Sequence, residues 1–285
     1  MATEAPPRAI PCFRRARGFR LYDMQGRRYL DLFRDGALLG HRPPGALTAM
    51  KAVLSQGLAG QVPSAWEGRL AAQLARLFPA FPRVRLFSAR ERALGAAAAW
   101  LGQPQADVLD SALCPSSPGR DHSMVPPLPR AVYWRPFLAV PVSARALLPI
   151  LPLTVGGAPA PVCFPAAAAQ GPSSPVPVSD TIAGFVCAGA LRALAALSDP
   201  GWAARLEPAD PRLAAALDGG RGWARVGPYV RALFPAEDYA RVHAEFLREG
   251  VLLCPAYPGP SVLPGECSPG ETSLLADLFA GISGA

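Results

Sequence analysis

The sequence is poor in three residue types on which many enzymes depend. It contains a single lysine, Lys51, no asparagine and only three histidines, whereas alanine, arginine and proline abound, as in proteins from GC-rich genomes. Any reaction that needs a lysine amine therefore depends on Lys51. The six cysteines form no Cys-x-x-Cys pair, and no histidine lies at metal-ligand spacing from a cysteine, which argues against a zinc site.

Long uninterrupted apolar segments are also lacking. Residues 146–179 carry no charged side chain, but prolines and Gly156, Gly157 and Gly171 interrupt them, so we expect no membrane-spanning helix. The first residues contain no apolar segment of the signal-peptide kind, and the cysteines are not spaced as a disulfide framework. We therefore expect a cytoplasmic protein with free thiols.

The composition is that of a globular protein with a basic balance. Of the 285 residues, 51% are hydrophobic and 17% charged, which suffices for one large domain or two smaller ones. The net charge of +7 is carried almost entirely by arginine. These arginines are spread along expected helices and mixed with acidic residues, and no known nucleic-acid-binding motif is present. A basic interaction module is therefore only a distant alternative.

Apolar periodicity predicts a mixed α/β fold. The stretch "RLYDMQGRRYLDL" predicts two strands around a turn at Gln25-Gly26, and "RVRLFS" predicts a strand that leads directly into a helix. "YWRPFLAVPV", "LLPILPL", "PVCF" and "GVLLCPAY" are compatible with further short strands. Asp210-Pro211 and the capping box at 268–271 each predict the start of a helix. Helices are predicted over residues 47–58, 65–78, 89–101, 182–197 and 236–249.

In this order, the elements resemble class III pyridoxal-phosphate-dependent aminotransferases, and in particular their glutamate-1-semialdehyde aminomutase branch. The stretches that carry the resemblance are "RLYDMQGRRYLDL", "LGHRPPGALTAMKAVLSQGL", "ARLFPAFPRVRLFSARERALGAAAAWL" and "YARVHAEFLREGVLLCPAYPGPSVLPGECSPGETSLLADLF". The resemblance implies a reduced type I pyridoxal-phosphate transferase fold with an eroded large domain, because the chain is shorter than members of the family. It places residues 1–58 and 210–285 in a small α/β domain built from both termini, and residues 59–209 in the large domain.

The resemblance also implies a vestigial cofactor site. In the family, a Ser-Gly-Thr turn holds the cofactor phosphate at a helix N-terminus, and Ser88, Ala89 and Arg90 align with it. Arg90 can pair with a phosphate, or it is a surface arginine in the first turn of a helix. Asp180, in "VSDTIAGF", is the one possible counterpart of the family's aspartate at the pyridinium nitrogen. Alternatively, it is a helix-capping or loop residue.

The resemblance places Lys51 on an early helix rather than at the Schiff-base position late in the large domain. A primary amine is needed for the covalent bond to the cofactor, and arginine cannot replace it. We therefore expect no covalent pyridoxal phosphate and no transaminase activity, although weak non-covalent binding is compatible with the sequence. In the family the active site lies between two subunits. Two associations follow: a homodimer, or a heterodimer in which this chain is the non-catalytic or half-site subunit of an active aminotransferase paralogue.

The histidines provide no alternative site. His41 belongs to a Gly-His-Arg-Pro turn, His122 to a polar loop beside Asp121, and His243 to a helix. The stretch "GGRG" at residues 219–222 predicts a turn rather than a phosphate loop.

Overall fold

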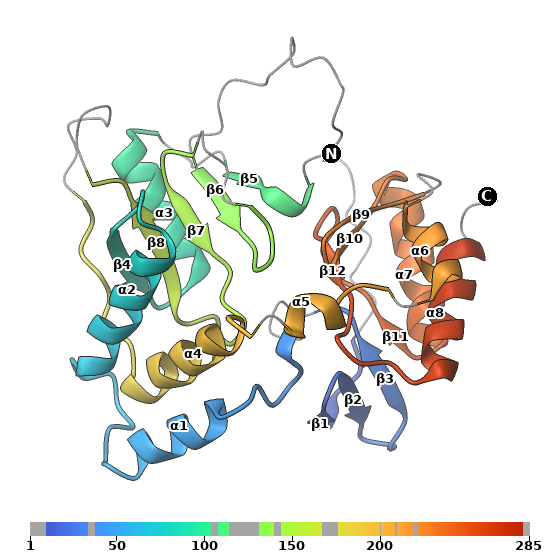
Figure 1. Ribbon diagram of the computed structural model, residues 1–285, viewed down its shortest axis with the longest axis horizontal. Helices are drawn as coiled ribbons and strands as arrows, with labels where there is room; N and C mark the ends of the chain where they lie inside the picture. The colour runs from blue at the N-terminus through green and yellow to red at the C-terminus, as the bar shows by residue number, and fades with distance from the viewer. Residues whose placement is uncertain are drawn as a thin grey trace. The chain divides into compact units, whose positions relative to one another are not determined.

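The chain folds into two compact units (Figure 1). This computed structural model describes residues 10–33, 38–103, 108–113, 131–139, 144–166, 176–199, 201–208, 210–218 and 222–281. Unit 1 comprises Met1–Arg42 and Pro200–Ala285, and unit 2 comprises Pro43–Asp199. The division falls at residues 42 and 199 rather than at residues 58 and 209. Asp121, His122 and residues 219–221 lie outside the described residues.

A three-stranded antiparallel meander begins unit 1. It consists of β1 (Phe13–Arg17), β2 (Arg20–Asp23) and β3 (Arg28–Asp31). The turn between β2 and β3 forms because the Asp23 carboxylate accepts hydrogen bonds from the backbone N–H groups of Gln25 and Arg27, at 3.0 and 2.8 Å. Gly26 provides the left-handed conformation there, with φ of 88°. The predicted hairpin is confirmed.

The two ends of the chain meet in unit 1. Strand β11 (Val251–Leu252) pairs in parallel with β3. A second sheet follows the order β12-β10-β9, and the Val262 N–H of β12 donates to the Leu32 carbonyl at 2.7 Å. Its strands are β9 (Trp223–Val226), β10 (Tyr229–Ala232) and β12 (Ser261–Val262). The prediction that both ends build one small α/β domain is confirmed.

Helices pack on these sheets around an aromatic core. Trp223, Phe246 and Phe279 are fully buried, and the ring centroids of Trp223 and Phe279 lie 4.9 Å apart. Asp210 accepts the Arg212 N–H at 2.7 Å at the start of α6, and the predicted capping box begins α8. The helices of this unit are α5 (Gly201–Arg205), α6 (Pro211–Asp218), α7 (Ala236–Arg248) and α8 (Pro269–Gly281).

Unit 2 is built on a five-stranded sheet of order β4-β8-β7-β6-β5. β5, β6 and β7 are parallel to one another, and β8 is antiparallel to both β7 and β4. The carboxyl ends of β4, β5, β6 and β7 therefore lie at the same edge. The strands are β4 (Arg83–Phe87), β5 (Val108–Asp110), β6 (Ala131–Trp134), β7 (Leu147–Pro149) and β8 (Ala160–Phe164). A short 3₁₀ turn, Ser111–Leu113, follows β5.

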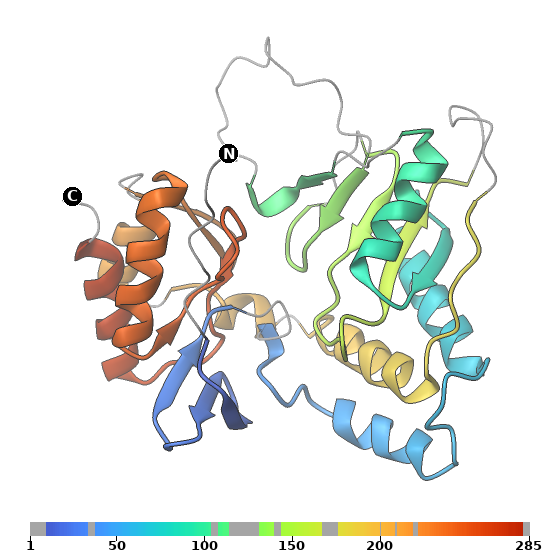
Figure 2. The same ribbon diagram turned by 180° about the vertical axis from the view of Figure 1, so that it is seen from behind.

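Helices cover both faces of this sheet, which Figures 1 and 2 show from opposite sides. Helices α2 (Ala65–Leu77) and α4 (Gly184–Ala196) pack on one face, against Val132 and Cys163 among others. Helix α3 (Arg90–Leu101) packs on the other face, against residues such as Phe164. Neighbouring strand residues thus enter opposite cores, as the pleat requires.

Helix α1 (Ala46–Leu54) belongs to unit 2. It packs against α4, where a Cβ added to Gly189 would lie only 2.7 Å from Met50 Cγ. This contact explains why unit 2 begins before α1, although residues up to 58 were expected in the small domain. Across the described ranges, no helix combines the length and apolar character that crossing a membrane requires.

Candidate functional site

The candidate site lies where β4 ends and α3 begins. Ser88 and Ala89 connect the two elements, and Ala89 is the residue that precedes the first turn of α3. The first backbone N–H groups of a helix have no partner within the helix, and the alanine side chain cannot accept a hydrogen bond from them. The helix dipole adds partial positive charge at the same place, so this position favours an anion.

The Asp180 carboxylate lies beside the start of α3, where it binds Ser88 and the side chain of Arg92. Its Oδ2 accepts hydrogen bonds from the Ser88 backbone N–H at 2.9 Å and from the Ser88 hydroxyl at 2.7 Å. The guanidinium of Arg92 binds both carboxylate oxygens, with Nε donating to Oδ2 at 2.6 Å and Nη2 to Oδ1 at 2.5 Å. The hydrogen bonds from Arg92, followed by those from Ser88, outweigh burial and hold the pKa of Asp180 well below its ordinary value.

An extended segment before α4 brings Asp180 to the end of β4. β4 is an edge strand, and this segment runs along it: the Leu86 N–H donates to Ser179 Oγ at 3.2 Å, and the Asp180 N–H donates to the Leu86 carbonyl at 2.8 Å. After Asp180, the Ile182 N–H donates to a Glu67 carboxylate oxygen at 2.9 Å. Glu67 itself belongs to the capping box of α2, so Asp180 is held by contacts on both sides.

Other charged and aromatic side chains gather at the carboxyl ends of the parallel strands. The guanidinium carbon of Arg90 lies 5.5 Å from the centre of the Tyr133 ring on β6, within the range of a cation–π contact. Arg135, just beyond β6, binds Asp110 at the end of β5 with contacts of 2.6–3.1 Å, and both side chains are almost buried. Burial raises the pKa of the Tyr133 hydroxyl, so it remains protonated at neutral pH.

The structure therefore brings together two of the residues expected at the cofactor site. Ser88 and Asp180 are in direct contact, Ala89 precedes the first turn of α3, and Arg90 contacts Tyr133. Asp180 lies in a segment before α4 and not at the end of a sheet strand, in line with the loop alternative. Sequence reasoning missed Arg92, Asp110 and Arg135.

A signal for the Asp180 contact was present in the sequence. Helix α3 begins with Arg90, Glu91 and Arg92, so positive charge exceeds negative charge in a first turn where the helix dipole favours negative charge. Such a helix start predicts a carboxylate from elsewhere in the chain.

Lys51 lies on the exposed side of α1. Both views of unit 2 show α1 beyond α4, on the side away from the sheet and from the start of α3 (Figures 1 and 2). The amine of Lys51 is therefore in solvent and outside the cluster around Asp180.

The histidines of unit 1 have structural surroundings. His41 Nε2 lies 2.9 Å from Oδ2 of Asp31, a carboxylate that is fully buried at the end of β3. The backbone N–H of His41 also donates to the Gly18 carbonyl at 2.8 Å, which holds the Gly-His-Arg-Pro turn in place. His243 is buried on α7 against Tyr239. Within the ranges that the structure describes, no three His, Cys, Asp or Glu side chains are grouped as a metal site.

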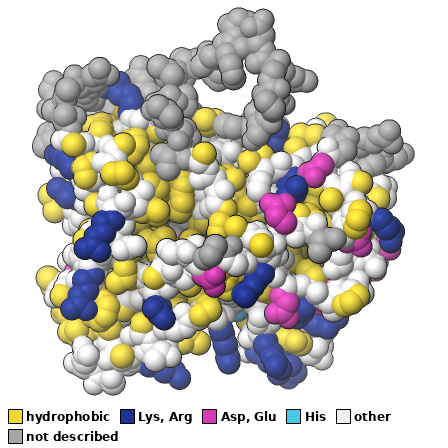
Figure 3. Space-filling view, in the orientation of Figure 1, with side chains coloured by type: hydrophobic (Ala, Val, Ile, Leu, Met, Phe, Trp, Pro, Cys, Tyr) yellow, Lys and Arg dark blue, Asp and Glu magenta, His cyan; other side chains and the backbone are white. Residues whose placement is uncertain are grey.

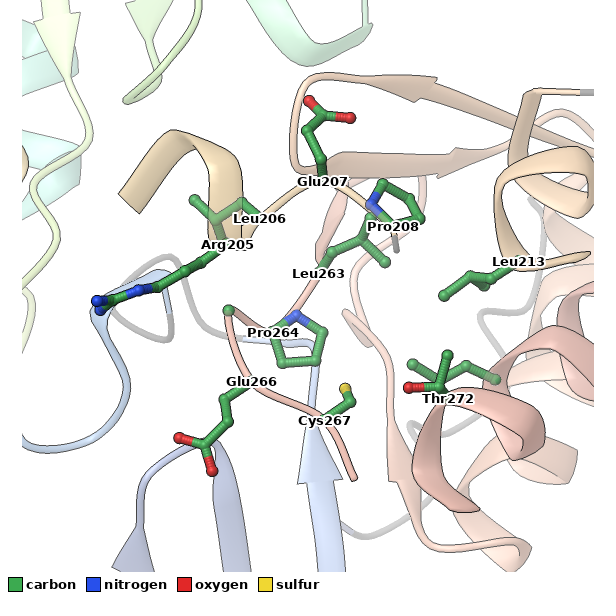
Figure 4. A pocket seen from close by; sticks show the side chains of 12 residues that line it. Arg205, Leu206, Glu207, Pro208, Leu213, Leu263, Pro264, Glu266, Cys267 and Thr272 are labelled. Carbon is green, nitrogen blue, oxygen red and sulfur yellow. The ribbon is translucent and has the colours of Figure 1, made fainter. Parts of the chain in front are cut away.

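Unit 1 also contains a pocket of about 310 Å³ (Figure 4). Its wall is mainly apolar, and the charged side chains that line it, Arg205, Glu207 and Glu266, point outward. Burial raises the pKa of the Cys267 thiol to about 12, so this cysteine is not a nucleophile at neutral pH. The pocket lining is Arg205, Leu206, Glu207, Pro208, Leu213, Leu263, Pro264, Gly265, Glu266, Cys267, Thr272 and Leu275.

Solved structures share this fold. An omega-transaminase from Sphaerobacter thermophilus superposes with a TM-score of 0.63 at 18% identity, over 96% of this chain and 90% of that chain. A glutamate-1-semialdehyde aminomutase from Pseudomonas aeruginosa PAO1 gives 0.63 at 16% identity, over 95% and 87%. The ornithine aminotransferase from Toxoplasma gondii gives 0.61 at 16% identity, over 98% and 92%. The chain thus has the fold of pyridoxal-phosphate-dependent aminotransferases.

Sequence comparison finds relatives of unknown function. An uncharacterized protein of Treponema pallidum is 36% identical over 144 residues, which is 48% of this chain and 46% of the relative. An uncharacterized protein of Borreliella burgdorferi is 40% identical over 62 residues, which is 21% of this chain and 23% of the relative. The chain thus matches less than half the length of these curated relatives. No family model matches the sequence.

The residues around α3 do not fit the cofactor of this fold. The resemblance predicts that the cofactor phosphate binds at Ser88, Ala89 and Arg90, but the Asp180 carboxylate already takes the hydrogen bonds of Ser88 there. The other acidic side chain at the strand ends, Asp110, is paired with Arg135, and Lys51 is on α1. We therefore derive no catalytic step through pyridoxal phosphate.

Proposed function

We propose that the chain is a degenerate aminotransferase-fold protein without transaminase activity. The observation that carries the proposal is the place of Lys51, the one lysine of the sequence, on the exposed side of α1. Transamination needs a primary amine that bonds to the cofactor and moves a proton at the reacting carbon. The arginines cannot do this, because a guanidinium stays protonated at neutral pH.

Borohydride trapping tests this proposal. The purified protein is mixed with pyridoxal phosphate, reduced with borohydride and examined by intact-mass and peptide mass spectrometry. We expect no adduct at Lys51 beyond that of an unrelated protein with one exposed lysine, and no turnover of an amino donor. Lys51→Arg, which keeps the charge but removes the amine, is the matched control. Stoichiometric trapping at Lys51 with amino-donor turnover, both absent from Lys51→Arg, would contradict the proposal.

The second candidate is a non-catalytic or half-site subunit, which pairs with itself or with an active aminotransferase paralogue. The surface of α1 favours it, because Leu47 and Leu54 are 42% and 40% exposed, one turn to either side of Lys51. Two leucines on the outer side of one helix form an apolar surface that a partner can cover. A cytoplasmic location belongs to the same proposal, and the buried thiols of Cys163, Cys187 and Cys254 are compatible with it.

A basic interaction module is the least favoured candidate. On the face shown in Figure 3, Lys and Arg side chains are scattered, and carboxylates lie close to several of them. Nucleic-acid binding through phosphates would show a steep fall in affinity with salt concentration, which a titration at two ionic strengths measures.

A further inference from the structure

We propose that the Asp180 carboxylate is a built-in occupant of the anion position at the start of α3, and that it keeps phosphate, free or as part of a cofactor, out of this position. The inference goes beyond the proposed function. That function depends on Lys51, whereas this inference depends on Ser88, Arg92 and Asp180. Either can fail without the other.

One carboxylate satisfies the donors that converge here. Oδ2 of Asp180 takes three hydrogen bonds, from the N–H and the hydroxyl of Ser88 and from Nε of Arg92, and Oδ1 takes the fourth, from Nη2 of Arg92. A phosphate at the same place would need these donors and would lie against a negative charge. Since the low pKa of Asp180 keeps it ionised across the neutral range, that repulsion is always present.

The segment that carries Asp180 is itself fixed in place. The backbone of the same segment is bound to β4 through Leu86, and Arg85 Nε donates to the Pro177 carbonyl at 3.0 Å. Beyond Asp180, Glu67 holds Ile182. Because the carboxylate is part of a segment fixed at both ends, its effective concentration at the start of α3 far exceeds that of a free anion.

The ion pair between Asp180 and Arg92 has little value as a surface ion pair that stabilises the fold. The Arg92 side chain is 62% exposed, and exposed pairs contribute little because water and salt screen them. The Asp180 side chain is 15% exposed and is bound by Ser88 as well as by Arg92. The donors of Ser88 and Arg92 thus form one anion-binding position, which the carboxylate fills.

The test removes the occupant and adds inorganic phosphate. We expect Asp180→Ala to bind phosphate saturably and at least about tenfold more tightly than the unsubstituted protein, measured by titration calorimetry at constant ionic strength. Removing Arg92 as well, in Asp180→Ala/Arg92→Ala, should abolish the gain. Asp218→Ala is the matched control, because Asp218 also pairs with an arginine, Arg225, but lies at the C-terminal end of α6.

A second measurement tests phosphate binding even if the substitution destabilises the protein. If Asp180→Ala melts at a lower temperature, phosphate should raise its melting temperature in a concentration-dependent way, as a ligand that binds only the folded state does. Asp218→Ala and the unsubstituted protein should show only the small common effect of the salt. The inference is overturned if the unsubstituted protein binds phosphate as well as Asp180→Ala. It is also overturned if phosphate fails to bind or stabilise Asp180→Ala.

Discussion

Glu271 shows how one carboxylate joins two distant parts of unit 1. Arg20 Nε and Nη2 donate to its two oxygens at 2.9 and 2.5 Å, and the Ser268 N–H donates to it at 2.7 Å. The Glu271 side chain is 7% exposed and that of Arg20 is 15% exposed. Burial alone would raise the pKa of Glu271, but the hydrogen bonds from Arg20 and Ser268 outweigh it and lower the pKa to about 2, from an ordinary value of 4.5.

Glu271→Gln should therefore be destabilising, and its stability should depend less on pH. Because the pKa of Glu271 is lower in the folded state, its contribution is complete above about pH 4.5 and is lost as the pH falls toward about 2. We expect the substitution to reduce the free energy of unfolding at pH 7 by about 2–3 kcal/mol. Urea denaturation at several pH values measures this.

Glu266→Gln is the matched control. Glu266 lies 3.6 Å from the same arginine, Arg20, but its side chain is 73% exposed, so we expect a change within about 0.5 kcal/mol. Equal effects of the two substitutions at pH 7 would contradict the role assigned to Glu271.

At the scale of elements, helix α2 (Ala65–Leu77) carries leucines that differ in burial. Helical spacing places Leu70, Leu74 and Leu77 on one face of α2. Leu70 and Leu74 are fully buried between α2 and the sheet, whereas Leu77 is 43% exposed. Leu77 ends the helix seven residues after Leu70, where the chain turns toward β4, so the helical period no longer decides its burial.

Leucine-to-alanine substitutions along α2 should separate these positions. Leu70→Ala leaves a cavity in the core and should lower the free energy of unfolding by about 3 kcal/mol, whereas Leu77→Ala should change it by less than about 1 kcal/mol. Chemical denaturation of the two variants measures the difference. Similar losses at both positions would show that Leu77 is packed like Leu70.

Local patterns predicted most elements and few of the long-range contacts. Alternation in β2 and β3, helical spacing in α2, and the caps of α6 and α8 each depend on neighbours in sequence, so a single sequence predicts them. The place of Asp180 could not be predicted in this way. Its contact with Ser88 joins residues 92 positions apart, and it forms because the segment before α4 runs along the edge of β4.

At the scale of the whole molecule, the surface of α1 (Ala46–Leu54) bears on the proposed association. Leu47, Lys51 and Leu54 follow one another at helical spacing on the exposed side, while Met50 and Val53 face α4 or are buried. Apolar side chains such as Leu47 and Leu54 suit the buried part of an interface, whereas lysine is depleted there and fits the polar rim. We therefore expect this surface to be covered in the proposed dimer.

Charge on this surface should disrupt the dimer. Light scattering at micromolar concentration should give a dimer for the unsubstituted protein and a monomer for Leu47→Arg/Leu54→Arg, because burying two additional charges without partners is costly. Met24→Arg is the control, since Met24 is 60% exposed in the hairpin of unit 1, and it should leave the dimer intact. A monomeric unsubstituted protein that also fails to bind an active aminotransferase paralogue would contradict both forms of association. A dimer that survives the double substitution would exclude α1 from its interface.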